Sequence, residues 1–172
     1  MKTLILSILF VCSFSIGIFA EGSRFIEKDT ASESSLEQLL SLYYSIKDAL
    51  VNSDASLAAS KAGEFVIAVK KIDSKNLSGS EQKTYTSLQD KLTADAKNIS
   101  QVKDIAKQRI FFASLSDNIY SLAKKVKLSA QPIYRDYCPM KKKYWLSRES
   151  AIKNPYFGKA MPTCGEVKET LK

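Results

Sequence analysis

The sequence predicts an all-α domain, an up-and-down four-helix bundle that carries an irregular cap at its C-terminal end. Apolar side chains recur at three- and four-residue steps in four successive segments between residues 34 and 127, the spacing of helices that each bury one face. All four prolines of the chain lie in residues 131 to 172, where no helical period continues. Short connections between amphipathic helices make neighbouring helices antiparallel, which favours the bundle.

The first 20 residues have the pattern of a secretory signal peptide: a lysine, an apolar run over residues 4 to 19 and a small residue at Ala20. An uncleaved membrane anchor is disfavoured because the run is short and is diluted by serines. A lipoprotein site at Cys12 is disfavoured because a bulky valine precedes it. We therefore expect an exported, periplasmic protein with no stable membrane span after cleavage, in which residues 21 to 33 form a flexible leader and residues 34 to 172 a single domain.

The helix starts are marked by capping residues. The first helix is expected to begin at a capping box formed by Ser34 and Glu37, and the third at a second box formed by Ser78 and Glu81. Asp54 can cap the second helix, while the fourth is expected from about residue 100. The apolar stripes of the segments include Leu40, Leu57, Phe65, Ile110, Leu115 and Ile119. Those expected to be buried are Leu40, Phe65, Leu115 and Ile119.

Residues 131 to 172 are interpreted as an ordered cap, because they hold six of the fourteen aromatic side chains that follow the signal peptide, whereas disordered segments are poor in aromatics. Residues 134 to 137 and 144 to 146 can pair as a short β-hairpin, residues 154 to 158 are typical of a turn, and residues 165 to 171 can form a terminal helical turn. The residues expected to pack the cap onto the bundle are Tyr137, Tyr144, Trp145, Pro155, Tyr156, Phe157 and Gly158.

The composition disfavours several functional classes. The chain has no histidine, which excludes Ser-His-Asp and Cys-His catalysis and HExxH zinc chemistry, so we expect no enzymatic activity. The formal net charge is +8, but an exported protein without an arginine-rich pattern is a poor candidate for a nucleic-acid partner. A soluble basic surface is the simpler interpretation.

Four sulfur atoms gather in the cap. Outside the signal peptide, both cysteines and both methionines lie in one stretch, first as Cys138-x-Met140 and then as Met161-x-x-Cys164. If the chain turns back at residues 154 to 158, the two pairs can face each other, so we expect the cysteines to be close together. Thiolate and thioether ligands without imidazole select a soft metal ion, with Cu(I) first, whereas zinc takes thiolate, imidazole and carboxylate ligands.

The competing interpretation is a disulfide between Cys138 and Cys164. Two cysteines in an oxidising compartment usually pair, and closing this loop could stabilise the fold by roughly 3.5 kcal/mol. Met140 and Met161 would then be ordinary gap-filling core residues. The two interpretations exclude each other for the cysteines, because a disulfide sulfur is no longer a thiolate. A thiol oxidoreductase is less favoured, since the cysteines lack a local Cys-x-x-Cys arrangement.

Several motifs of the chain resemble those of one family. They are Tyr137-Cys138-Pro139-Met140, Tyr144-Trp145-Leu146-Ser147, Asn154-Pro155-Tyr156-Phe157-Gly158, Met161 and Cys164-Gly165 in the cap, and Gln108-Arg109-x-x-Phe112 before it. Together they resemble the DUF3347 family of exported bacterial proteins, over residues 40 to 170. Members of that family stand alone or are fused to the periplasmic adaptor subunits of heavy-metal efflux pumps. The resemblance therefore implies copper or a related metal as ligand, and an efflux adaptor or another periplasmic protein as partner. The histidines or extra methionines that many relatives carry near their termini are absent here.

The leading hypothesis is an exported, non-enzymatic protein that binds a soft metal through Cys138, Met140, Met161 and Cys164 and supports metal handling or efflux. The alternative is a structural or protein-interaction domain that is held by a disulfide and binds no metal.

Overall fold

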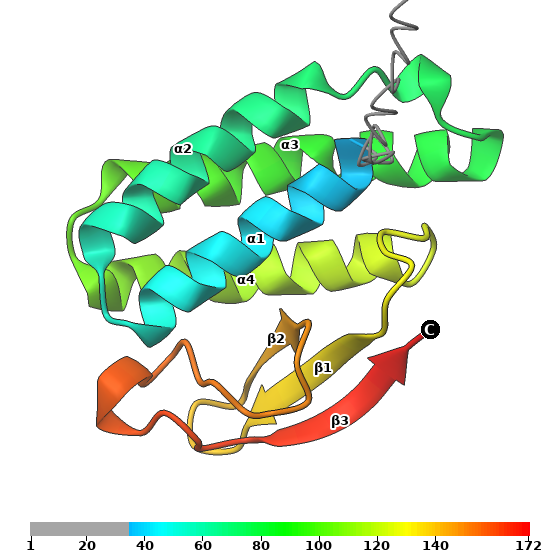
Figure 1. Ribbon diagram of the computed structural model, residues 1–172. Coiled ribbons are helices and arrows are strands. Elements are labelled where there is room, and N and C mark those ends of the chain that lie inside the picture. Colours follow the sequence, from blue (N-terminus) through cyan, green and yellow to red (C-terminus); the bar gives the residue numbers. More distant parts are fainter. Residues whose placement is uncertain (1–34) are drawn as a thin grey trace, which may run out of the picture. The chain divides into compact units, whose positions relative to one another are not determined.

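The computed structural model describes residues 35–172, and this part of the chain folds into four α-helices followed by a three-stranded antiparallel β-sheet (Figure 1). The expected signal peptide, the leader and Ser34 of the first capping box lie outside the described residues. Within residues 35–172, no helix has both the length and the apolar character needed to cross a membrane.

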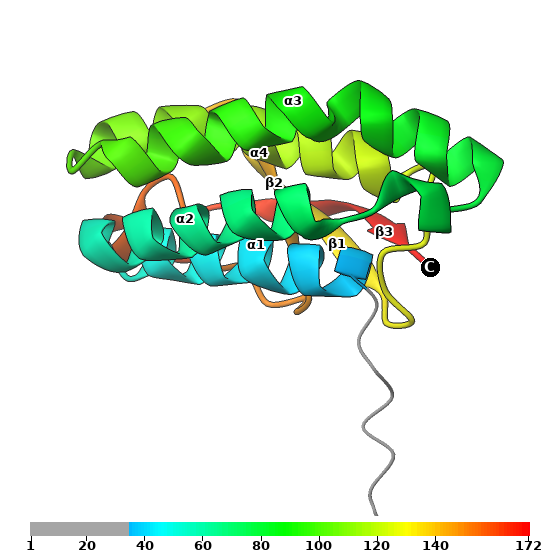
Figure 2. The same cartoon turned by 90° about the horizontal axis from the view of Figure 1, so that it is seen from above.

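The helices are α1 (Ser35–Val51), α2 (Ala55–Lys71), α3 (Gly79–Gln101) and α4 (Ile105–Ala123), with a short 3-10 helix, η1 (Ser74–Asn76), between α2 and α3. Each helix packs against the next one in the chain. Helices α1 and α4 lie next to the sheet, and α2 and α3 cover them on the side away from it (Figures 1 and 2). The apolar core of the helices therefore continues into the sheet through α1 and α4.

Capping residues position most of the helix starts where the sequence predicts them. Asp54 caps α2, and the Glu81 carboxylate accepts hydrogen bonds from the amide of Ser78 at 3.1 Å and from its hydroxyl at 2.6 Å. The fourth helix begins later than the predicted residue 100. Asp104 caps α4 by accepting hydrogen bonds from the first free amides of this helix at 2.7 and 3.2 Å. Helix α3 therefore ends before Asp104, and α4 starts after it.

Burial confirms the predicted core, with two corrections. Leu40, Phe65, Leu115 and Ile119 are buried as expected. Leu57 and Ile110 belong to the predicted stripes, but their side chains are 43% and 69% exposed. The buried face of α4 follows Gln108, Phe112, Leu115, Ile119 and Leu122. Ile110 comes two residues after Gln108, roughly 200° around the helix axis, so it lies on the outer side of α4.

The cap contains a three-stranded sheet, so the all-α prediction is corrected, while residues 148–165 between the second and third strands are irregular apart from one short 3-10 helix. Its strands are β1 (Ile133–Cys138), β2 (Lys143–Ser147) and β3 (Glu166–Leu171), in the order β2-β1-β3. The predicted hairpin is confirmed, because β1 and β2 pair from Tyr134 with Ser147 to Cys138 with Lys143. The predicted terminal helical turn is wrong. Residues 166 to 171 instead pair antiparallel with the free edge of β1, which satisfies backbone hydrogen-bonding groups on both strands.

One tyrosine joins the sheet to the helices. The Tyr43 hydroxyl accepts a hydrogen bond from the Leu146 amide at 2.9 Å and lies 2.8 Å from the Ser116 hydroxyl, which itself donates to the Phe112 carbonyl. The tyrosine is therefore the donor to Ser116, and α1, β2 and α4 are connected at one buried point. Of the aromatic and turn residues expected to pack the cap, Trp145, Pro155, Tyr156 and Gly158 are buried, while Tyr137, Tyr144 and Phe157 are half-buried.

Candidate sulfur site and its supporting loop

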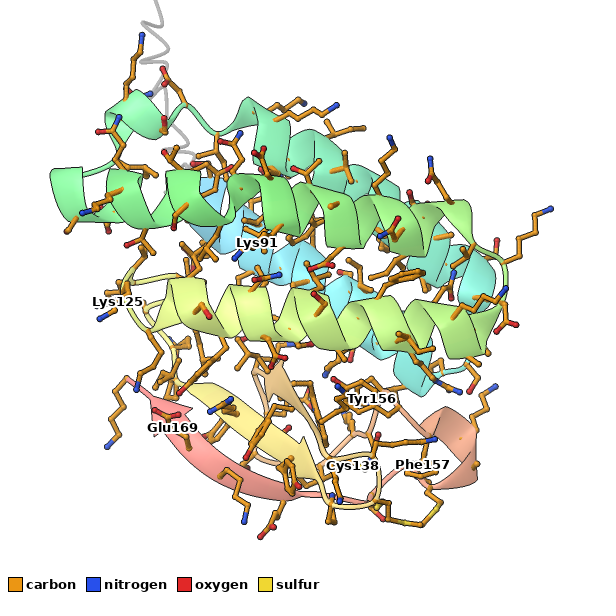
Figure 3. The ribbon with its side chains drawn as sticks, turned by 180° about the vertical axis from the view of Figure 1, so that it is seen from behind. Lys91, Lys125, Cys138, Tyr156, Phe157 and Glu169 are labelled. Atoms are coloured by element: carbon orange, nitrogen blue, oxygen red, sulfur yellow. The ribbon has the colours of Figure 1, made fainter. Side chains whose placement is uncertain are left out.

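The four predicted sulfur residues lie at one end of the sheet. Cys138 is the last residue of β1 and is fully buried, and Met140 follows in the turn to β2 (Figure 3). Met161 ends the short 3-10 helix η2 (Gly158–Ala160), and Cys164 is half-buried two residues before β3. Each of these two segments thus carries one thiol and one thioether.

The structure brings the two cysteines together. Tyr137 pairs with Glu166 in the β1–β3 register, so Cys138 comes opposite Gly165 and Cys164 is the next residue along. Both cysteines are unbridged, and the Cys138 thiol lies close enough to Cys164 to influence its pKa. Burial, and then the neighbouring Cys138 thiol, raise the pKa of Cys164. Cys164 therefore holds its proton more tightly than an exposed thiol, and that proton must be displaced before this thiol can bind a metal.

The methionines are not part of the core. Met140 is 62% exposed and Met161 is 38% exposed, so the interpretation of both as gap-filling core residues is wrong. The backbone explains their exposure, because both belong to connections between elements and not to the faces that the helices cover. In residues 35–172 no group of three or more His, Cys, Asp or Glu residues is arranged to hold a metal ion, and the sulfur set itself contains only two residues of these types.

Asn154 fixes the loop that leads to Cys164. Its fully buried side chain donates a short hydrogen bond to the Cys164 carbonyl and accepts hydrogen bonds from the amides of Tyr156 at 2.8 Å and Phe157 at 3.2 Å. The backbone N–H of Asn154 donates a hydrogen bond to the Pro162 carbonyl at 2.8 Å. The turn predicted at residues 154 to 158 therefore also determines where the backbone of the second thiol lies.

Arg109 anchors the same loop to the helices. Its Nε donates to the Pro155 carbonyl at 2.8 Å, and its Nη2 donates to the Leu50 carbonyl at 3.2 Å and to the Ser53 hydroxyl at 3.1 Å. Gly158 packs directly against this guanidinium. In the sequence, Arg109 stands out only as part of the family resemblance, because its partners are 46 to 59 residues away in the chain and no local pattern reveals them.

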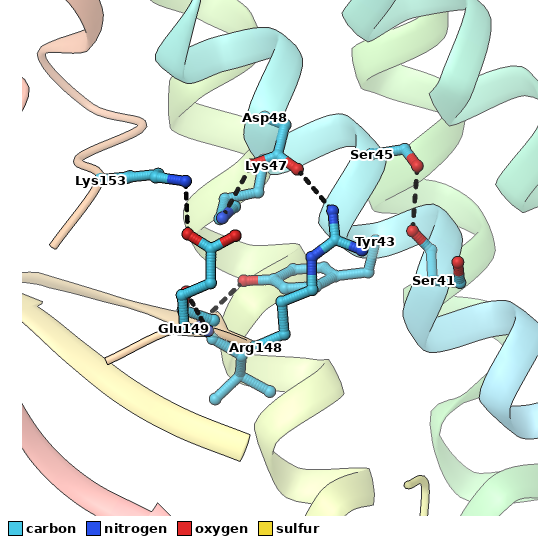
Figure 4. A network of polar contacts seen from close by, with 10 residues as sticks. Ser41, Tyr43, Ser45, Lys47, Asp48, Arg148, Glu149 and Lys153 are labelled. Carbon is cyan, nitrogen blue, oxygen red and sulfur yellow. Dashed lines mark hydrogen bonds and ion pairs between the residues drawn. The ribbon is translucent and has the colours of Figure 1, made fainter. Parts of the chain in front are cut away.

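A second feature that sequence reasoning missed is the buried carboxylate of Asp136. Neither of its oxygens has a hydrogen-bond partner in the described chain, and burial raises its pKa to about 7, partly opposed by Lys47. Lys47 is buried on α1 and forms an ion pair with Asp48 at 2.8 Å, which also pairs with Arg148 at 3.2 Å (Figure 4). This charged cluster lies where α1 meets the sheet, and its signal in the sequence is an aspartate between the aromatic residues of a strand.

Comparison with known proteins identifies one family. The family described as "Protein of unknown function (DUF3347)" matches residues 39–131. No curated protein and no solved structure matches the chain. The matched range holds most of α1, all of α2, α3 and α4, and ends just before β1, so the sheet that carries the four sulfurs lies outside it.

Proposed function

The chain belongs to the DUF3347 family, and we propose that it is an exported, non-enzymatic protein that binds a soft metal ion, Cu(I) first, in metal handling or efflux. The observation that carries this proposal is the contact between the two unbridged thiols, with one thioether in each of the segments that hold them. The ligands are Cys138 and Cys164, with Met140 and Met161 completing the set. Soft sulfur donors without imidazole match Cu(I) better than they match Zn²⁺ or the ions that prefer oxygen ligands, such as Mg²⁺ and Ca²⁺.

The proposal includes the setting of the site. The four helices form an up-and-down bundle, supported by their short connections and by the packing of each helix on the next. The first 20 residues direct export to the periplasm, supported by their charged start, apolar run and small residue at the end. The partner is a heavy-metal efflux adaptor or another periplasmic protein that receives the metal through the exposed methionine side of the site.

A second candidate function is a structural or protein-interaction domain held by a Cys138–Cys164 disulfide. The approach of the two thiols favours it as well, because the β1–β3 register brings the segments that carry Cys138 and Cys164 side by side, and the oxidants of the periplasm supply the oxidation. In the chain-entropy model, the loop that this disulfide closes would stabilise the fold by roughly 3.5 kcal/mol. The redox state of the exported protein decides between the two candidates, since only the reduced dithiol can bind Cu(I).

The first experiment determines that redox state. Protein purified from the periplasm is alkylated before and after reduction, and its intact mass is measured. Two alkyl groups without prior reduction are expected if the pair is kept as a metal-binding dithiol. A mass lower by two hydrogen atoms, with alkylation only after reduction, would contradict the metal proposal for the resting protein.

The second experiment tests the ligand set. Reduced protein competes for Cu(I) with a chromophoric chelator, and the wild type is compared with Met140→Leu/Met161→Leu and with Cys138→Ser/Cys164→Ser. We expect the methionine variant to bind at least about tenfold more weakly, since two soft ligands are lost, while its stability stays within about 1 kcal/mol because both positions are exposed. The cysteine variant should not compete. Equal affinity of the methionine variant and the wild type would exclude the four-sulfur site and leave a dithiol.

A further inference from the structure

A pocket of about 250 Å³ opens between α4 and the turn that joins β1 to β2. One wall is formed by Ala106, Ile110 and Ala113 of α4, of which Ile110 is exposed and Ala113 is buried. Tyr156 lines the opposite side, between α4 and the sheet (Figure 3). None of the four sulfur residues lines this pocket, so it is separate from the proposed metal site.

The apolar part of the pocket is pre-formed. Tyr156 is only 5% exposed, its ring packs edge-on against Trp145 with centroids 5.9 Å apart, and its hydroxyl donates to the Tyr144 carbonyl. The phenol oxygen is therefore occupied, and the ring contributes apolar surface. Ile110 is 69% exposed, the most exposed of the large apolar side chains in residues 35–172. Apolar surface of this kind, beside a pocket, is typical of a ligand site.

The charged part of the pocket is basic. Arg109, Lys141 and Lys143 line it, and none of the three has a carboxylate within 4.0 Å in the described residues. Arg109 uses Nε and Nη2 to anchor the loop, and its Nη1 takes no part in these hydrogen bonds. Asp117, one turn beyond Ala113 on α4, interacts electrostatically with Lys143, and burial raises the pKa of its carboxyl. The groups that face the pocket therefore carry a positive excess.

We propose that this pocket binds a small organic acid. The carboxylate lies among Arg109, Lys141 and Lys143, and a short alkyl or aryl body lies on Ile110 and the Tyr156 ring. The volume is slightly below the roughly 300 to 1,000 Å³ of pockets for drug-sized ligands, which fits a ligand of modest size. Both parts of the ligand are needed, because an exposed lysine pair alone gives little affinity in water.

The test is a titration of the whole exported chain with octanoate, followed by calorimetry and by the fluorescence of Trp145, the only tryptophan of the protein. Trp145 contacts Tyr156, so its emission is expected to change when the pocket fills. Acetate, which lacks the apolar body, and octylammonium, which reverses the charge, should each bind at least about tenfold more weakly. Absence of octanoate binding up to about 10 mM would overturn the proposal.

Matched variants locate the binding. Lys141→Glu should weaken octanoate binding by about fivefold or more, while Lys142→Glu, the same charge change at the adjacent residue that does not line the pocket, should change it less than about twofold. Ile110→Ser should likewise weaken it, while Ile67→Ser, at a 55% exposed position on α2, should not. If each control variant weakens binding as much as its pocket counterpart, octanoate binds the basic surface in general and the proposal is wrong. The Cu(I) and octanoate titrations use different residues, so either proposal can fail alone.

Discussion

Replacing Gly158 by alanine should destabilise the protein strongly, because this residue is where the cap loop meets the helices. Gly158 has a φ of +56°, a conformation that residues with a side chain rarely adopt. A Cβ at this position would lie 2.4 Å from Arg109 Nη2, 2.4 Å from Ser53 Oγ and 2.9 Å from the Leu50 carbonyl oxygen. The last of these is backbone at the end of α1, so the side chain cannot be accommodated by a rotamer change alone.

The size of the effect follows from these contacts. The positive φ costs a non-glycine residue about 1 to 2 kcal/mol. Displacing the guanidinium removes its hydrogen bonds to Leu50 and Ser53, and hydrogen bonds of charged groups contribute about 1.5 to 3 kcal/mol each when buried, less where solvent reaches them, as it does here. We expect Gly158→Ala to lower the free energy of unfolding by about 3 to 5 kcal/mol.

Urea unfolding followed by circular dichroism measures this change, and Gly63→Ala is the matched control. Gly63 lies within α2, and a Cβ there would meet no atom within 4 Å. The control should therefore raise the free energy of unfolding by about 0.5 to 1 kcal/mol, since alanine is the better helix former. If Gly158→Ala costs less than about 1 kcal/mol, the Arg109 anchor does not hold the loop and the reasoning is refuted.

Three further substitutions test other parts of the fold by urea unfolding. Burial raises the pKa of Asp136 to about 7, above its unfolded value, so the carboxyl destabilises the fold increasingly as pH rises from about 4 to 7. Asp136→Asn should match the wild type near pH 4 and be more stable by up to about 4 kcal/mol at pH 8, whereas a difference independent of pH would contradict this. Tyr43→Phe leaves the Leu146 amide without its partner and should cost about 1 to 3 kcal/mol, and no loss would mean that this junction is dispensable. Ser78→Ala should cost about 1 kcal/mol through the α3 cap, and a neutral result would show that the contact of the Ser78 hydroxyl with Glu81 contributes nothing.

Local patterns predicted the parts of the fold that depend on neighbours in the chain. Asp54 and the Ser78–Glu81 box marked helix starts because a cap and its partner amides are a few residues apart. The hairpin was predictable for the same reason, since β1 and β2 are joined by a short turn. In contrast, β3 pairs with β1 across about thirty residues, and nothing in its own six residues excludes a helical turn.

The sulfur site shows the same division between local and distant contacts. The order of the two Cys/Met pairs predicted that the cysteines approach each other, and the structure brings them into contact. The reason is different from the one the sequence offered, because the β1–β3 register sets the approach and the turn at residues 154 to 158 anchors the loop to α1 and α4. Met140 and Met161 were open to either interpretation, since exposure depends on which elements cover a turn and not on the residue type.

The two cysteines are attached to the strands of the sheet on one side, and the connections next to them are exposed to solvent on the other side. Cys138 ends a central strand, and Cys164 precedes an edge strand that α4 holds through Glu169, which accepts hydrogen bonds from Tyr120 at 2.6 Å and Lys124 at 2.8 Å. The β1–β3 register therefore determines how closely the backbones of the two cysteines approach each other. Met140 and Met161 lie in the connections next to the two thiols, and both are exposed to solvent. Thioethers are neutral, soft and weaker donors than thiolates, so under the proposed function exposed methionine ligands would suit a site that passes Cu(I) to a partner more than one that stores it.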